Sequence, residues 1–144
     1  MRAQRGNRGR DRIGRMRVID IDRCARRRDR RTLERDLRTA IEEGRIDIAY
    51  QPIVCVATGE ITSVEALARW SEPDRGAIPP DIFIALAEDC GLIDELGEQI
   101  LRRACIDGLA WPEKLKVAVN LSPRQFYSGM LTDTVLRVVE ETGF

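Results

Sequence analysis

ITSVEALARW at residues 61–70 is predicted to be a β-strand, because its side chains alternate between an apolar set and a more polar set. The preceding stretch IDIAYQPIVCV, residues 46–56, alternates in a similar way, and only the turn ATGE at residues 57–60 separates the two. Strands this close in sequence pair as an antiparallel hairpin. Pro52 lies inside the first strand, so we expect an edge position or a bulge there.

Helices and one more strand follow from the spacing of the apolar residues. The sequence predicts four helices, which begin near Thr32, Pro80, Ile93 and Met130 and end near Gly44, Gly91, residue 107 and Gly143. KVAVNLS at residues 116–122 is nearly all apolar, which is typical of a strand covered on both faces. SEPDRGAIPP at residues 71–80 has the composition of a loop. Because strands alternate with helices, we expect an α/β architecture with a parallel core.

The charges divide the 144-residue chain into a basic and an acidic part. Residues 1–35 hold 14 arginines against 5 acidic residues, a net charge of +9, and residues 36–144 hold 10 basic against 19 acidic residues, a net charge of −9. Residues 1–31 show almost no apolar periodicity, so we expect an arginine-rich arm or interdomain linker there. No aromatic residue is interleaved to stack bases, which argues against nucleic-acid binding by this arm.

The composition excludes several classes of protein and of site. No run approaches the ~20 apolar residues of a membrane span, so none is expected. There is no histidine and no CxxC pair, which excludes the usual Cys/His zinc sites and every histidine-based triad. We interpret the four cysteines as small buried hydrophobes in a reducing cytoplasm, where we expect the protein to be located.

Strand alternation places candidate ligands on one side of the predicted sheet. Glu65 and Arg69 point the same way, Gln51 lies opposite the main apolar set of its strand, and Asn120 lies opposite the valines of residues 116–122. Carboxylate and amide oxygens suit a hard cation such as Mg²⁺ or Mn²⁺. The guanidinium of Arg69 offers a planar fork for a phosphate, and Gln51 could hydrogen-bond a base or a sugar.

A purely structural role accounts for the same residues. Glu65 and Arg69 could form an ion pair on a solvated strand face, and Asn120 could satisfy the backbone of a loop. From the spacing alone, this structural role is the better supported of the two. The acid pair Glu88 and Asp89 is expected on a solvated helix surface.

Four blocks of sequence resemble, in order and spacing, the EAL family of bacterial cyclic di-GMP phosphodiesterase domains. The blocks are YQPIV at 50–54, EALARW at 65–70, IPPDIFIALAEDCGLI at 78–93 and AVNLSPRQF at 118–126. The resemblance covers about residues 33–144. It implies a TIM-type (β/α) barrel, present to about its first half and with an antiparallel first hairpin, and it implies metal-dependent hydrolysis of cyclic di-GMP to linear pGpG.

The resemblance also assigns roles to residues. It implies that Glu65 and Asn120 bind Mg²⁺ or Mn²⁺, and that Gln51, Leu67 and Arg69 hold cyclic di-GMP, with Arg69 on a phosphate. These are the side chains that alternation had already placed on one face. The resemblance therefore favours a binding site over the structural role.

The later blocks of the family have no counterpart in this chain. A complete barrel takes about 250 residues, and the missing blocks supply a second metal-binding glutamate, an Asp-Asp pair and a catalytic lysine. Attack on a phosphodiester is served by two clamping metals, so we expect an incomplete catalytic set and a chain that is inactive alone. The alternative is a non-catalytic module that binds cyclic di-GMP or another protein.

The basic part resembles the junction between two signalling domains. Residues 15–44 are similar to the arginine-rich helix that joins a GGDEF (diguanylate cyclase-like) domain to an EAL domain. The expected organisation is a linker over 1–31 and an incomplete EAL domain over 32–144. Expected partners are an EAL or GGDEF domain, or a second copy of the chain.

Overall fold

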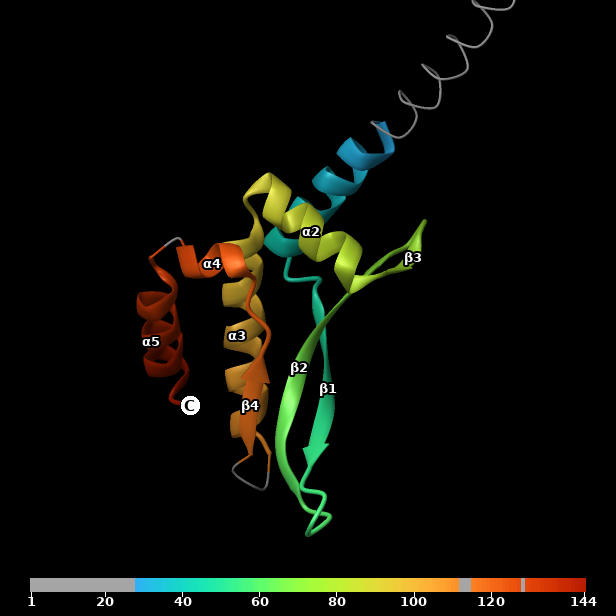
Figure 1. Cartoon of the computed structure of the whole chain (residues 1–144). Helices are drawn as coiled ribbons and strands as arrows, with labels where there is room; N and C mark the ends of the chain where they lie inside the picture. Colours follow the sequence, from blue (N-terminus) through green and yellow to red (C-terminus); the bar gives the residue numbers. More distant parts are fainter. Residues whose placement is uncertain (1–27, 112–114, 128) are drawn as a thin grey trace, which may run out of the picture. The chain divides into compact units, whose positions relative to one another are not determined.

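The computed structural model describes residues 28–111, 115–127 and 129–144, and these fall into two units that are divided between Arg35 and Asp36 (Figure 1). In the first unit, residues 28–35 are helical, and Thr32 Oγ1 donates a hydrogen bond to the carbonyl oxygen of Arg28 at 3.0 Å. The helix thus already includes Arg28, four residues before the predicted start. Most of the predicted arm, residues 1–27, lies outside the described residues, and its role as a linker stays a prediction.

The second unit is built around a long hairpin and a parallel strand. Its elements are β1 (Asp47–Val54), β2 (Ile61–Glu72), β3 (Gly76–Ile78), α2 (Pro80–Cys90), α3 (Ile93–Leu109), β4 (Lys116–Val119), α4 (Pro123–Tyr127) and α5 (Leu131–Thr142). Strand β2 is central: it pairs antiparallel with β1, parallel with β4 and, through its last residues, antiparallel with β3. The antiparallel first hairpin and the α/β alternation are confirmed (Figure 1).

Pro52 lies on an edge strand, as the sequence predicts. Within the described sheet β1 pairs only with β2, so β1 is an edge strand that tolerates a residue without an N–H donor. The register shifts between Ile53 and Val54, which is the expected irregularity. The hairpin turn closes with a hydrogen bond from Cys55 N to Glu60 O at 2.8 Å.

Two local predictions are wrong. Residues 71–80 are not all loop, because Gly76 adopts φ 70° and lets the chain turn back so that β3 pairs with the end of β2. Strand β4 is not covered on both faces: Ala118 is exposed, and only Val117 and Val119 are half-buried. The apolar residue Ala118 therefore faces the open side of the sheet.

The core lies between the apolar face of β2 and the helices. Val64, Ala66 and Trp70 are buried on that face, as their alternation predicts. On α3 the buried residues recur at helical spacing, and they include Leu96, Ile100 and Ala104. Figure 1 shows α3 running beside β4. In the part of the chain that the structure describes, α3 leaves the face of β2 that carries Glu65 uncovered.

The helical residues from Asp36 onward, which belong to the second unit, contribute to this core. Leu37, Ala40 and Ile41 are fully buried, as the helical spacing predicts. Gln99 Nε2 on α3 donates to the carbonyl oxygen of Ile41 at 2.6 Å, which satisfies one of the acceptors that a helix end leaves open. Gly44, with φ 67°, ends the turn at the predicted residue.

Helix α5 packs on α3 through Val138 and an ion network. Arg137 Nη2 lies 2.7 Å from Glu98 Oε2, and Arg102 Nη2 lies 2.6 Å from Glu141 Oε2. The hydrogen bond from Arg137 is the main cause that lowers the pKa of Glu98, and Arg102 adds to it. Several charges share this network, which is the condition under which partly exposed ion pairs contribute measurably to stability.

Two compositional predictions can be compared with the structure. No helix in the described part of the chain combines the length and the apolar character that crossing a membrane requires. Cys105 is buried, and burial raises the pKa of its thiol, whereas Cys55 and Cys90 are only half-buried. Cys24 lies outside the described residues. The interpretation of the cysteines as buried hydrophobes is therefore correct for Cys105 and too general for the other two.

Candidate functional site

The uncovered face of the β1–β2 hairpin carries four of the five predicted site residues. Gln51 lies directly opposite Glu65, and the next pair along this face is Ala49 opposite Leu67. Directly opposed residues of an antiparallel pair point to the same face. Gln51, Glu65 and Leu67 therefore form one contiguous surface.

Arg69 continues the same row toward the end of β2. It lies opposite Asp47 in the register, two residues beyond Leu67. Its side chain is exposed, and Nη1 donates to the carbonyl oxygen of Ala68 at 2.9 Å. A guanidinium has five N–H donors, so this one hydrogen bond leaves donors available for a phosphate.

Asn120 reaches this surface from the neighbouring parallel strand. The register pairs Glu65 with Ala118, and Asn120 lies two residues further on, hence on the same side. Its Nδ2 donates a hydrogen bond to Glu65 Oε1 at 2.6 Å. The contact joins residues 55 positions apart in the sequence, and it brings together the two residues predicted to bind a metal.

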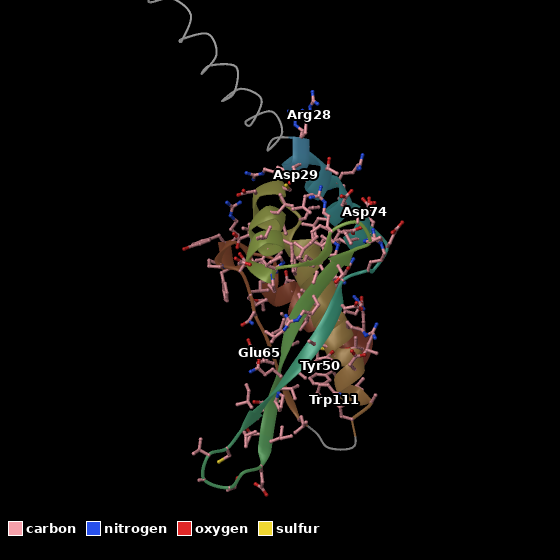
Figure 2. All side chains as sticks on the ribbon, turned by 90° about the vertical axis from the view of Figure 1, so that its right-hand side faces the viewer. Arg28, Asp29, Tyr50, Glu65, Asp74 and Trp111 are labelled. Atoms are coloured by element: carbon pink, nitrogen blue, oxygen red, sulfur yellow. The ribbon has the colours of Figure 1, made fainter. Side chains whose placement is uncertain are left out.

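The two faces of the hairpin have different environments. Figure 2 shows Glu65 on one side of the ribbon, and Tyr50 and Trp111 on the other, where α3 lies. On that covered side the rings of Tyr50 and Trp111 meet edge to face at 5.0 Å, and the Tyr50 hydroxyl donates to Asp107 Oδ2 at 2.8 Å. Burial and this hydrogen bond raise the pKa of Tyr50. The covered face is thus structural, and the polar groups of the other face remain accessible.

The donor set fits part of the coordination shell of a hard cation. Glu65 offers carboxylate oxygens, and the amide of Asn120, whose nitrogen donates to Glu65, has its oxygen left as an acceptor. Mg²⁺ takes near-octahedral oxygen coordination and keeps several waters. Within the described ranges no group of three or more His, Cys, Asp or Glu side chains could hold a metal. Glu65 and Asn120 can therefore supply two of the oxygen ligands of a metal site, one from each residue.

Sequence reasoning missed the residues that hold the loop after β4. Ser122 and Gln125 are buried, and Ser122 Oγ donates to Glu88 Oε1 at 2.5 Å. The prediction of a solvated helix surface is wrong for Glu88, which is half-buried and accepts this hydrogen bond, whereas Asp89 is exposed. A signal was present: Ser-Pro-Arg-Gln at 122–125 has the spacing of a capping box with proline at the first helical position, which indicates the start of α4.

Comparison with known proteins assigns a family. The model of the EAL domain family matches residues 34–144. Cyclic di-GMP phosphodiesterase NbdA of Pseudomonas aeruginosa is 42% identical over 115 residues, which are 77% of this chain and 15% of that protein. Cyclic di-GMP phosphodiesterase PdeR of Escherichia coli is 39% identical over 115 residues, 78% of this chain and 17% of that protein. The chain thus spans a small part of these relatives.

Solved structures agree with this comparison. The chain is similar to the PaMucR phosphodiesterase in its c-di-GMP complex, with a TM-score of 0.74 and 38% identity over 78% of this chain and 47% of that chain. The FimX EAL domain of Xanthomonas citri, solved in complex with c-diGMP, has a TM-score of 0.69 at 20% identity, which supports the fold alone. The predicted TIM-type fold is confirmed, over about half the length of these domains.

Proposed function

Because the chain belongs to the EAL domain family, we propose that it carries one wall of a cyclic di-GMP phosphodiesterase site, on the uncovered face of β1, β2 and β4. The observation that carries this proposal is the 2.6 Å contact between Asn120 Nδ2 and Glu65 Oε1. It brings a carboxylate and an amide from different strands to one point. The names of the relatives NbdA and PdeR support the substrate class.

The proposed cofactor is Mg²⁺ or Mn²⁺, since EAL domains are generally dependent on a divalent metal. Glu65 would supply a charged oxygen, and Asn120 a neutral one. Such a metal, when bound, supplies Lewis-acid polarisation of a phosphoryl oxygen. Around it, the chain's own part is to present these two oxygens together and to orient the dinucleotide.

The dinucleotide would lie along the row that ends at Arg69. Arg69 would donate to a phosphate, where a planar guanidinium forms charge-assisted hydrogen bonds. Leu67, half-buried between Glu65 and Arg69 on the face, would contact an apolar surface of the ligand, and Gln51 would hydrogen-bond a polar edge. All of these groups lie on the face of β1 and β2 that α3 does not cover.

Arg69→Ala should weaken binding of cyclic di-GMP by this chain about tenfold or more. The reason is that one charge-assisted hydrogen bond contributes about 1.5–3 kcal/mol. Titration of the ¹⁵N-labelled chain with cyclic di-GMP and Mn²⁺, followed by NMR shifts of the backbone amides of β1 and β2, gives the dissociation constant. Arg75→Ala, an exposed arginine in the turn before β3, is the matched control. Equal loss in both variants would remove Arg69 from the site.

We expect no turnover of cyclic di-GMP by the purified 144-residue chain with Mn²⁺. Displacement at a phosphodiester is served by two metals that clamp the attacking and leaving oxygens, and Glu65 with Asn120 provides at most part of one shell. Chromatography of the reaction for linear pGpG tests this. Hydrolysis that disappears in Glu65→Ala would show that the chain is a complete enzyme.

A second candidate function is a non-catalytic module that binds a protein partner. The observation favouring it is a cluster of exposed apolar side chains at the end of the β1–β2 hairpin. The cluster comprises Ile53, Val54, Val56 and Ile61, which are 43%, 47%, 102% and 48% exposed. An EAL or GGDEF domain or a second copy of the chain would cover it, in a cytoplasmic signalling protein. Sedimentation of the chain as a strict monomer at micromolar concentration would count against self-association.

A further inference from the structure

Asn120 lies where the sheet no longer holds the backbone. Strand β4 ends at Val119, and the last paired residues in its register with β2 are Ala66 and Val119. Asn120 is itself exposed. Its side chain can meet Glu65 reproducibly only if the chain that follows it is fixed, so the residues after it decide where the amide lies.

The backbone that follows Asn120 is fixed by a capping box at residues 122–125. Ser122 N donates to Gln125 Oε1 at 2.9 Å, and Ser122 Oγ accepts from Arg124 N at 3.2 Å. This reciprocal arrangement satisfies backbone N–H groups at the start of α4. Ser122 and Gln125 are 8% and 4% exposed, so the box is buried although α4 has only five residues.

Ser122 also forms a hydrogen bond to helix α2. The Ser122 hydroxyl donates to Glu88 Oε1 at 2.5 Å while it accepts from the backbone, so both of its hydrogen-bonding roles are used. Arg124 Nη1 donates to the carbonyl oxygen of Glu88 at 2.6 Å, near the end of α2. A cation is favourable at that end of a helix. The loop is therefore tied to α2 at two points.

Helix α3 makes room for the capping box with a glycine. A Cβ on Gly97 would lie 2.2 Å from Gln125 Nε2, closer than any side chain could tolerate without moving. Gly97 is buried in the interior of α3, where glycine is less favourable than alanine. A side chain at this position would therefore have to displace the Gln125 amide, whose oxygen accepts the hydrogen bond from Ser122 N.

From these contacts we propose that Glu88, Ser122 and Gln125 are positioning residues that, in the space provided by Gly97, fix the Asn120 amide against Glu65. We call these four residues the loop clamp. The clamp acts through the backbone of residues 120–122 and touches neither metal nor dinucleotide. The importance of Asn120 as a metal ligand rests on the proposed function, whereas the position of its amide does not.

The test follows the Asn120 side-chain amide in the ¹⁵N-labelled full chain, where Asn120→Ala identifies its signal. In the wild type we expect one amide proton shifted and protected from solvent exchange by the bond to Glu65. Ser122→Ala should abolish that protection and should weaken Mn²⁺ binding roughly 10- to 100-fold, the usual cost of losing a residue that orients a ligand. Ser122→Thr, which keeps the hydroxyl, should restore both.

Two further variants separate positioning from stability. Val138→Ala removes buried packing on α5 and destabilises the fold, yet it should leave the Asn120 amide protected at temperatures where the chain is folded. Glu88→Ala should reproduce the loss seen in Ser122→Ala, whereas Glu88→Gln keeps an acceptor oxygen and should not. Gly97→Ala should disturb the amide in the wild-type background and should have no additional effect once Gln125 is alanine.

The outcomes distinguish this inference from the proposed function. An unchanged Asn120 amide in folded Ser122→Ala or Glu88→Ala would overturn the clamp, whatever the metal does. Protection lost equally in Val138→Ala would also overturn it, because general destabilisation would then suffice. If the clamp variants lose protection while Glu65→Gln leaves Mn²⁺ affinity unchanged, the clamp stands and the proposed metal site fails.

Discussion

Glu65→Gln should lower the affinity of this chain for Mn²⁺ at least about tenfold, which corresponds to about 1.4 kcal/mol, and should leave the fold intact. The substitution removes the negative charge of the carboxylate, which hard divalent cations prefer. It keeps Oε1, so a glutamine at this position can still accept the hydrogen bond that Asn120 Nδ2 now donates at 2.6 Å. The change therefore isolates the charge from the geometry.

Calorimetric titration with Mn²⁺ measures the affinity, and urea unfolding followed by circular dichroism checks the fold. Glu60→Gln is the matched control, because Glu60 is an exposed acid in the hairpin turn and carries the same charge outside the row. We expect Glu60→Gln to bind Mn²⁺ as the wild type does. Equal affinities of Glu65→Gln and the wild type would show that Glu65 binds no metal in this chain.

The face on which the candidate site lies could be predicted from the sequence. Alternation over 61–70 separates Val64 and Ala66 from Glu65 and Leu67, and a period of two leaves no other assignment once one set is buried. The short turn at 57–60 then requires the antiparallel hairpin that places Gln51 on the same side. Patterns such as alternation and turn length depend only on neighbouring residues, so they can be recognised in the sequence alone.

The meeting of Asn120 with Glu65 could not be predicted in the same way. It depends on the parallel register that pairs Glu65 with Ala118, and two helices separate these strands in the sequence. The family resemblance assigned both residues to a metal, but it gave no contact between them. The register of two strands joined by a long connection depends on how the intervening helices pack. The spacing of residues within either strand carries no information on that packing.

The errors have a common physical origin in tertiary contacts. Glu88 has the pattern of a surface acid on α2, yet it is half-buried and contacts Ser122 and Arg124, which lie more than 30 residues further on. Strand β4 looks like a strand covered on both faces, yet Ala118 is exposed. In both cases the residue type is compatible with two environments, and the packing of distant elements decides between them.

Trp70→Ala should be the most destabilising single change in this core. Trp70 is 1% exposed, its ring meets Phe83 edge to face at 5.9 Å, and Nε1 donates to Glu72 Oε1 at 2.9 Å. Truncation of a buried tryptophan to alanine costs about 3–5 kcal/mol. Because a domain is stable by only about 5–15 kcal/mol, we expect much of the variant to be unfolded near physiological temperature.

The substitution Trp70→Ala also removes a hydrogen bond to Glu72. Burial acts to raise the pKa of Glu72, but the hydrogen bonds from Arg45, whose Nη1 donates at 2.8 Å, and from Trp70 lower it overall. Removing Trp70 leaves Arg45 as the remaining hydrogen-bond donor of the two, so the Glu72 carboxylate, which links the end of β2 to the loop that contains Arg45, is held by one donor fewer.

Trp111→Ala is the matched control, because Trp111 is only half-buried and contacts Tyr50 on the hairpin. Unfolding in urea, followed by far-ultraviolet circular dichroism so that the missing indole does not alter the signal, gives both free energies of unfolding. We expect the loss in Trp70→Ala to exceed that in Trp111→Ala by a wide margin. Equal losses would mean that the contact of Trp70 with Phe83 and Glu72 does not anchor the core. The Tyr50–Trp111 pair on the α3 side of the hairpin would then contribute as much to the free energy of unfolding as Trp70 does.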